Sequence, residues 1–350
     1  MKRGGNAVDA AIAAHTVLGL VEPQSSGLGG GGYMVVYDRK SNTTTVIDGR
    51  ETAPMTATAD YFTVNGKNLG FVEAILSGKS VGVPGAVALY KTAHEKFGKL
   101  PFADLLAPAI EIAERGYSVP VVVRQKWAAA AALPELTDQP GFAQAFLPHA
   151  RAPHVGELFR FHEAARTLRL IAQTKGEAFY RGEVAQAIEK HAREHGGAMR
   201  AADLAAYRPE WVEPIAKHYA GHTLHEIPPN GQGIAALIAL GILSNFDLKG
   251  LKADSTEAQH LQVEAMKLAF ADTYRYVSDA RSMELTPAQM LDDEYLFQRA
   301  KLIDRRRAQD FGAGNPVKGG TIYLTAADEQ GMMVSFIQSN YMGFGSGCVE

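Results

Sequence analysis

The sequence predicts an α+β fold, in which helices pack on a β-sheet that both ends of the chain help to build. Near the N-terminus, a β-branched and aromatic run at Tyr33–Asp38 and a partner strand that ends at Arg50 outline a hairpin. Near the C-terminus, residues 321–327 and 332–338 outline a second hairpin. Between the two hairpins, residues from 86 to 310 have mostly helical patterns.

The N-terminal region begins with a helix. Small and apolar residues recur at helical spacing over Ala7–Leu20, and Asp9 lies in the first turn, where a carboxylate suits the helix dipole. Pro23 ends this helix, and a glycine-rich loop, Gly27–Gly32, leads into the first strand.

The middle of the chain contains several helical segments, which breaks rich in proline and glycine separate. The clearest segments are Ala86–Phe97, Phe102–Arg115, Gly233–Asn245 and Glu257–Val277. The second hairpin follows them and turns at Asp328–Gly331. We expect its strands to join those of the first hairpin in one sheet.

The composition is that of an ordinary soluble globular protein, with 46% hydrophobic and 21% charged residues among 350. The formal net charge of −3 argues against a nucleic-acid partner, and the basic run at 305–307 is typical of a solvated helix end. The single cysteine, Cys348, excludes a disulfide within the chain and a zinc site built from cysteines. No apolar run reaches about 18 residues, so we expect no membrane span.

Two motifs resemble binding sites but lack the required context. Gly27, Gly29 and Gly32 match the dinucleotide fingerprint, yet a helix precedes them and a strand follows, which reverses the order that the fingerprint requires. His191 and His195 lie one helical turn apart, but Ala192 stands where a zincin has glutamate. We therefore predict no nucleotide and no metal at these positions.

The two ends of the chain read like the middle of a domain. The first residues, MKRGGNAVDAA, run into a helix almost at once, and the last residues, GFGSGCVE, follow a strand and a glycine-rich turn. We expect a fragment at both ends. No signal peptide is visible. The sequence does not distinguish a cytoplasmic protein from a periplasmic or secreted one.

Three segments together carry a resemblance that covers nearly the whole chain in order. They are KRGGNAVDAAIAAHTVLGLVEPQSSGLGGGGYMVVYD at 2–38, DGRETAP at 48–54 with SVGVPGAV at 80–87, and GGTIYLTAADEQGMMVSFIQSNYMGFGSG at 319–347. They resemble the γ-glutamyltranspeptidase family of N-terminal-nucleophile hydrolases. The resemblance implies a four-layer αββα sandwich, truncated here, and an inactive precursor that cleaves itself into a large and a small subunit.

Matched to that family, Thr321 is the catalytic nucleophile and Gly320–Thr321 is the cleavage site. Residues 1–320 would be the large-subunit region, truncated at its N-terminus, and 321–350 the incomplete start of the small subunit, in one structural domain overall. An N-terminal threonine carries its own base, because its α-amine has a pKa of about 7.7–8.0. Without the resemblance, Thr321 would read as a strand-start threonine.

The resemblance also assigns roles to Arg50 and Ser339. Arg50 matches the arginine that holds the α-carboxylate of the substrate, and a guanidinium suits that task because it donates two parallel hydrogen bonds. The alternative is a surface arginine paired with Asp48 or Glu51. Ser339 matches a catalytic-site threonine that hydrogen-bonds the nucleophile, and the alternative is an ordinary polar strand residue.

Because the sequence departs from the family pattern, the resemblance does not identify the acyl group that the enzyme transfers. Tyr341 stands where many transpeptidases have an asparagine that contacts the α-amine of the glutamyl group. The implied function is a γ-glutamyl transferase or hydrolase acting on amides such as glutathione, without a cofactor. An acylase of other amides, such as β-lactam side chains, and an inactive relative with a binding role are the alternatives.

The resemblance places the oxyanion hole, paired serines and an acidic substrate ligand beyond residue 350. Loss of one oxyanion donor costs about 10²–10³ in rate, so we expect the chain as given to be inactive or nearly so. We also expect an exposed apolar surface beside residues 321–347 and a tendency to aggregate.

Overall fold

The computed structural model describes residues 1–311, 322–339, 344 and 346–349. Its contacts divide the chain into two compact units. Unit 1 comprises Met1–Thr43, Ile47–Glu210 and Lys318–Glu350, and unit 2 comprises Thr44–Val46 and Trp211–Val317. The predicted α+β class is confirmed, since the described residues contain both helices and antiparallel sheets. The single structural domain and the division at 320/321 remain predictions.

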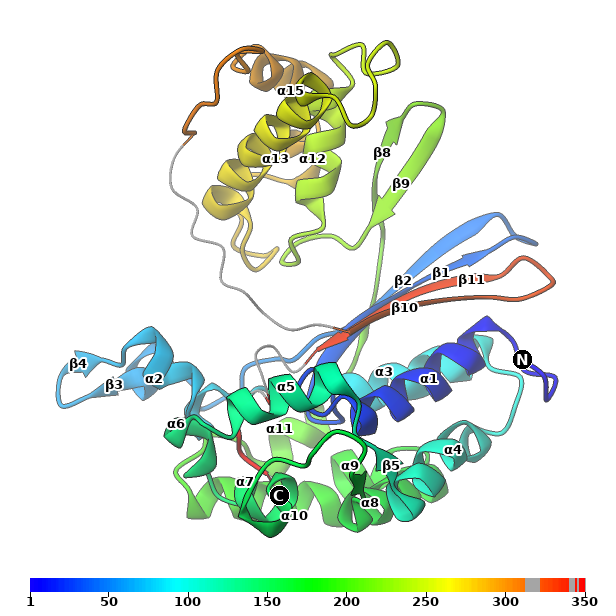
Figure 1. The fold of residues 1–350 in the computed structure, drawn as a ribbon, viewed down its shortest axis with the longest axis vertical. Helices are drawn as coiled ribbons and strands as arrows, with labels where there is room; N and C mark the ends of the chain where they lie inside the picture. The colour runs from blue at the N-terminus through cyan, green and yellow to red at the C-terminus, as the bar shows by residue number, and fades with distance from the viewer. Residues whose placement is uncertain (312–321, 340–343, 345, 350) are drawn as a thin grey trace. The chain divides into compact units, whose positions relative to one another are not determined.

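The central sheet joins the two ends of the chain, as the sequence predicts (Figure 1). Among the described residues it has five strands in the order β10-β11-β1-β2-β7. Their bounds are β1 Gly31–Asp38, β2 Thr43–Gly49, β7 Glu210–Val212, β10 Ile322–Ala327 and β11 Met333–Ser339. β11 pairs antiparallel with both β1 and β10, and its register places Ser339 opposite Gly31.

One face of this sheet packs on helices α1 (Ala7–Val21) and α3 (Ala86–Phe97), as Figure 1 shows. Residues alternate along each strand, so Met34 and Val36 of β1 and Phe336 of β11 are buried. Their neighbours on the opposite face, such as Val35 and Ile337, are half-buried, and 51% of Met333 is exposed. The exposed apolar surface expected beside residues 321–347 remains a prediction.

Helix α1 begins at a capping box that also fastens a distant loop. The Asn6 side chain accepts a hydrogen bond from the Asp9 amide at 3.0 Å, and the Asp9 carboxylate accepts one from the Asn6 amide at 3.0 Å. The same carboxylate accepts hydrogen bonds from the amides of Lys99 and Leu100. Asp9 therefore ties the start of α1 to the loop between α3 and α4 (Phe102–Arg115).

Unit 1 contains several other helices. The predicted helices Ala86–Phe97 and Phe102–Arg115 are confirmed as α3 and α4. The remaining helices are α2 Phe71–Ile75, α5 Val121–Ala130, α6 Pro134–Thr137, α7 Phe142–Phe146, α8 His162–Thr174, α9 Glu177–Arg181, α10 Glu183–Glu194 and α11 Ala201–Ala206. Short strand pairs join β3 Thr63–Val64 to β4 Lys67–Asn68 and β5 Tyr117–Ser118 to β6 Leu158–Phe159.

Unit 2 is built on α12 (Ile234–Leu243) and α13 (Thr256–Tyr276), which confirm two predicted helices. Helices α14 (Pro287–Met290) and α15 (Asp293–Ala300) complete its core. Unit 2 also contains a hairpin, β8 Ile215–Tyr219 and β9 His222–Glu226, within the region that the sequence predicts as mostly helical. β9 is largely exposed and rich in polar residues, so it lacks the apolar run that indicates a strand.

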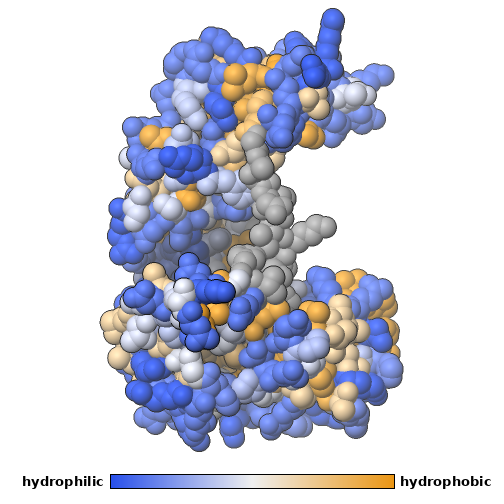
Figure 2. All heavy atoms as spheres, turned by 90° about the vertical axis from the view of Figure 1, so that its left-hand side faces the viewer, coloured by the Kyte–Doolittle hydropathy of each residue, from blue (hydrophilic) through white to orange (hydrophobic). Residues whose placement is uncertain are grey.

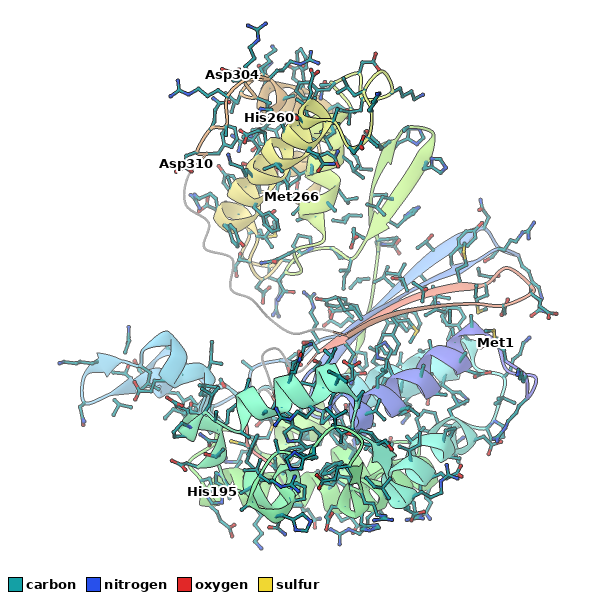
Figure 3. The ribbon with its side chains drawn as sticks, in the orientation of Figure 1. Met1, His195, His260, Met266, Asp304 and Asp310 are labelled. Carbon is teal, nitrogen blue, oxygen red and sulfur yellow. The ribbon has the colours of Figure 1, made fainter. Side chains whose placement is uncertain are left out.

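The outward side of α13 is partly apolar. Leu261, Ala265 and Leu268 are buried in the core of unit 2, whereas Val263 and Met266 are exposed. Figure 2 shows apolar atoms gathered on this side of unit 2, and Figure 3 labels Met266 on the helix. Even so, no helix in the described part of the chain is both long and apolar enough to cross a membrane.

Candidate active site

The structure describes two of the predicted site residues, Arg50 and Ser339. Arg50 follows β2 directly, and Ser339 is the last residue of β11. The predicted nucleophile Thr321, the preceding Gly320 and the predicted substrate-binding residue Tyr341 lie outside the described residues. The geometry below therefore concerns the surroundings of Arg50 and Ser339.

The sheet brings Ser339 and Arg50 to the same end. Ser339 pairs with Gly31, the first residue of β1. A Cβ atom on Gly31 would lie 2.8 Å from the Gly49 carbonyl oxygen and 2.8 Å from the Glu51 amide nitrogen, on either side of Arg50. The absence of a side chain at Gly31 thus lets the segment that carries Arg50 approach the start of β1 and its partner Ser339.

Helix α3 begins against the same segment. The amides of Gly85 and Ala86 each donate a hydrogen bond to the Gly30 carbonyl oxygen at 3.0 Å. A Cβ atom on Gly85 would lie 2.0 Å from the Gly49 carbonyl oxygen and 2.3 Å from Tyr207 Oη, so no larger residue fits without displacing the end of β2. This explains the second glycine, Gly85, in the SVGVPGAV segment at 80–87.

The Asp48 carboxylate holds the guanidinium of Arg50. Arg50 Nε donates to Asp48 Oδ1 at 2.9 Å and to Oδ2 at 3.1 Å, and Nη2 also donates to Oδ2. About a fifth of each side chain is exposed, at 20% for Arg50 and 19% for Asp48. Burial lowers the pKa of Arg50, but the hydrogen bonds and charge of Asp48 outweigh it and raise the pKa above its ordinary value.

Aromatic residues support Arg50 from two further directions. The carbon at the centre of its guanidinium lies 5.2 Å from the centroid of the Tyr33 ring, at a cation–π distance. Tyr207 Oη donates a hydrogen bond to the Arg50 carbonyl oxygen at 2.7 Å. Burial raises the pKa of Tyr207 above its usual range, so the hydroxyl keeps the proton that it donates.

A buried hydrogen-bond network lies next to Ser339. The preceding residue, Gln338, points to the opposite face of the sheet, where its side chain is buried. Gln338 Nε2 donates to the Gly27 carbonyl oxygen at 2.7 Å, and Tyr90 Oη donates to Gln338 Oε1. The end of β11 is therefore fastened to the glycine-rich loop and to α3.

A buried histidine lies further along β11. His15 Nε2 is 3.2 Å from the Phe336 carbonyl oxygen, and because a carbonyl only accepts, Nε2 carries the proton. Burial lowers the pKa of His15 from 6.5 to about 4, and this hydrogen bond only partly offsets the effect. His15 is therefore neutral at pH 7.

Among the described residues, no group of three or more histidine, cysteine, aspartate or glutamate side chains could hold a metal ion. The ring centroids of His191 and His195 are 4.5 Å apart, and His195 lies at the outer surface of unit 1 (Figure 3). The arrangement around Arg50 suits a carboxylate-bearing ligand instead.

The sequence interpretation missed part of this site. It named Asp48 as a surface partner of Arg50, but it did not identify Tyr33 or Tyr207 as support for the guanidinium. The Asp48–Arg50 spacing was a usable signal, since a carboxylate two residues before an arginine can hydrogen-bond it. Tyr207 lies 157 residues from Arg50, and nothing local in the sequence points to that contact.

Comparison with known proteins adds independent evidence. The family model described as gamma-glutamyltranspeptidase matches residues 1–350. The glutathione hydrolase proenzyme of Bacillus subtilis strain 168 is 33% identical over 369 residues, which cover 99% of this chain and 62% of that protein. The chain thus spans about three-fifths of the length of this curated relative.

Two solved structures are also similar. The cephalosporin acylase from Bacillus halodurans is 42% identical with a TM-score of 0.90, over 99% of this chain and 64% of that one. The gamma-glutamyltranspeptidase from Pseudomonas nitroreducens complexed with L-DON is 33% identical with a TM-score of 0.80, over 88% of this chain and 91% of that one. These structures confirm the predicted fold class of the N-terminal-nucleophile hydrolase type.

Proposed function

This chain belongs to the γ-glutamyltranspeptidase family, and from that premise we propose that the protein containing it is a γ-glutamyl transferase or hydrolase. Its substrates are γ-glutamyl amides such as glutathione. The observation that carries the proposal is the match of the family model over all of residues 1–350. The supported guanidinium of Arg50 at the end of the central sheet is in keeping with it.

Activation requires cleavage of the Gly320–Thr321 bond. The Thr321 hydroxyl attacks the Gly320 carbonyl carbon, the peptide C–N bond breaks, and the acyl group moves from nitrogen to oxygen. The Thr321 nitrogen is then a free α-amine, and water hydrolyses the ester, which frees the Thr321 hydroxyl and leaves Gly320 with a carboxylate. In the precursor this nitrogen is an amide and cannot accept a proton, so cleavage supplies the base that catalysis needs.

In turnover, the free threonine supplies both the base and the nucleophile. Its α-amine takes the hydroxyl proton while the oxygen attacks the γ-amide carbon, and the proton passes to the departing amine. The γ-glutamyl group stays on Thr321 as an ester until water or an acceptor amine attacks. Ser339 donates a hydrogen bond to the Thr321 oxygen and steadies it for both attacks.

Arg50 binds the α-carboxylate of the donor. A guanidinium and a carboxylate form two parallel charge-assisted hydrogen bonds, which fix the orientation of the ligand as well as its position. The nucleophile, the base and the group that binds the substrate carboxylate are thus all protein groups.

The test is hydrolysis of γ-glutamyl p-nitroanilide by the full-length protein. We expect release of nitroaniline, with a higher rate when an acceptor dipeptide is present. A protein that is cleaved at Gly320–Thr321 but leaves this substrate intact would contradict the γ-glutamyl assignment.

A second candidate is an acylase that acts on other amides. Two observations favour it: Tyr341 replaces the asparagine of many transpeptidases, and the similar solved structure with 42% identity is a cephalosporin acylase. The same assay with a glutaryl amide of a β-lactam nucleus separates the two. A larger kcat/KM for the glutaryl amide than for the γ-glutamyl anilide would favour the acylase.

A further inference from the structure

The hydrogen bonds of Arg50 leave one edge of its guanidinium open. Asp48 accepts from Nε and from Nη2, so its carboxylate occupies the edge that these two nitrogens form. Arg50 Nη1 donates to no acceptor among the described residues. A guanidinium has five N–H groups in a rigid plane, and the edge between Nη1 and Nη2 has the spacing of a carboxylate.

Three contacts fix the plane and position of that guanidinium. The Asp48 carboxylate binds one edge of the guanidinium and also accepts a hydrogen bond from the Arg50 backbone amide at 3.0 Å. The guanidinium carbon lies over the Tyr33 ring, 5.2 Å from the ring centroid. Tyr207 holds the Arg50 carbonyl oxygen at 2.7 Å. The guanidinium edge, the guanidinium carbon and the backbone carbonyl of Arg50 are therefore each contacted by a different residue.

Tyr207 packs against a second tyrosine that is itself hydrogen-bonded on both sides. The Tyr207 ring stacks on the Tyr180 ring, with 5.8 Å between centroids and 11° between planes. Tyr180 Oη donates to the Pro84 carbonyl oxygen at 2.8 Å and accepts from the Ala88 amide at 3.0 Å. This pair of tyrosines links the backbone of Arg50 to the start of α3.

We infer that Asp48, Tyr33 and Tyr207 are positioning residues, which orient Arg50 so that its Nη1–Nη2 edge receives the planar carboxylate of the donor. The inference rests on the proposed function. A side chain that already points its free edge at the ligand loses less conformational entropy on binding than a mobile arginine. Loss of this support therefore weakens donor binding and leaves the chemical step at Thr321 unaffected.

The test uses the full-length protein with γ-glutamyl p-nitroanilide as the donor. Asp48→Asn removes the charge that holds the guanidinium edge, and Tyr207→Phe removes one hydroxyl at the backbone. We expect KM to rise about 10-fold for Asp48→Asn and about 5-fold for Tyr207→Phe, with kcat within about twofold, because each change removes one hydrogen-bonded support. KM does not depend on how much of a variant folds.

Two further variants separate the possible results. Asp279→Asn alters a second Asp-x-Arg pair, in which Asp279 is also hydrogen-bonded by the arginine two residues later, and we expect no change in KM. Arg50→Ala tests the proposed function itself: an unchanged KM would remove Arg50 from the site. If Arg50→Ala raises KM while Asp48→Asn and Tyr207→Phe leave it within twofold, the positioning role is overturned and the proposed function stands.

Discussion

The pair Asp48–Arg50 has a local duplicate in Asp279–Arg281, and the two differ in exposure. In both, the arginine Nε and one Nη donate to a carboxylate two residues earlier. The exposed fractions are 19% and 20% for the first pair but 50% and 89% for the second. Exposed ion pairs contribute little to stability. Substitutions in the Asp279–Arg281 pair therefore serve as controls for the same substitutions at Asp48 and Arg50.

The first prediction concerns the guanidinium of Arg50. Arg50→Lys keeps the charge but loses the planar pair of donors, so we expect KM for γ-glutamyl p-nitroanilide to rise about 10-fold to 100-fold, the equivalent of about 1.5–3 kcal/mol. Cleavage at residue 320 should proceed normally. Arg281→Lys should change neither quantity, and an unaltered KM in Arg50→Lys would remove Arg50 from substrate binding.

The second prediction concerns His15 and acid stability. Burial lowers its pKa from 6.5 to about 4, so between these values the unfolded chain binds the proton more readily than the folded one. The contribution to stability is complete above pH 6.5 and is lost as the pH falls towards about 4. Its size is on the order of 3 kcal/mol, from the two pKa values and 1.36 kcal/mol per pKa unit.

Urea unfolding at pH 7 and at pH 4.5 measures this contribution. His15→Gln keeps a donor for the Phe336 carbonyl but cannot titrate, so its stability should fall less between the two values than that of the parent protein. His222→Gln, at an exposed histidine, should behave like the parent. Equal acid sensitivity of His15→Gln and the parent would show that another group is responsible.

At the scale of elements, the start of α3 and the end of β2 approach each other without room for a side chain. A Cβ atom on Gly85 would lie 2.0 Å from the Gly49 carbonyl oxygen. The amides of Gly85 and Ala86 also donate hydrogen bonds to the Gly30 carbonyl oxygen, which ties the start of α3 to the residue before β1. The packing of these elements therefore determines where the residue after β2, Arg50, is placed.

The third prediction tests this approach. Gly85→Ala should lower the free energy of unfolding by about 1–3 kcal/mol, as overpacking does elsewhere, and should also raise KM because the end of β2 moves. Gly70→Ala is the matched control, since a Cβ atom there meets nothing within 4 Å, and should change stability by less than about 0.5 kcal/mol. Normal stability and KM in Gly85→Ala would contradict the predicted clash.

The elements differed in how well the sequence predicted them. Helices α3 and α4 were predicted residue for residue, because their apolar positions recur every three to four residues over a long stretch. The β8–β9 hairpin was missed, because its strands are short and its exposed residues show no apolar run. Periodicity reports a buried face, so elements without one give little signal.

At the scale of the whole molecule, the joining of both hairpins in one sheet was predictable, but the contacts that support the site were not. Both hairpins have strand-like runs of β-branched residues, and a sheet formed from both ends was a direct expectation. The network of Tyr90, Gln338 and Gly27, in contrast, joins residues that are 248 and 311 positions apart. Long-range polar contacts of this kind depend on packing, which no local pattern encodes.

We propose that the protein is a precursor that cleaves itself before Thr321. Thr321→Ala removes the attacking hydroxyl and should leave one uncut chain on a denaturing gel, whereas Thr321→Ser keeps a hydroxyl and should still be cut. Thr325→Ala changes an exposed threonine of β10 and should be cut like the parent.

N-terminal sequencing of the smaller product of the full-length protein identifies the bond that is cleaved. We predict two chains, with the smaller one beginning Thr-Ile-Tyr-Leu from residue 321. A smaller chain that begins at any other residue, or a protein that stays uncut after purification and incubation, would contradict it.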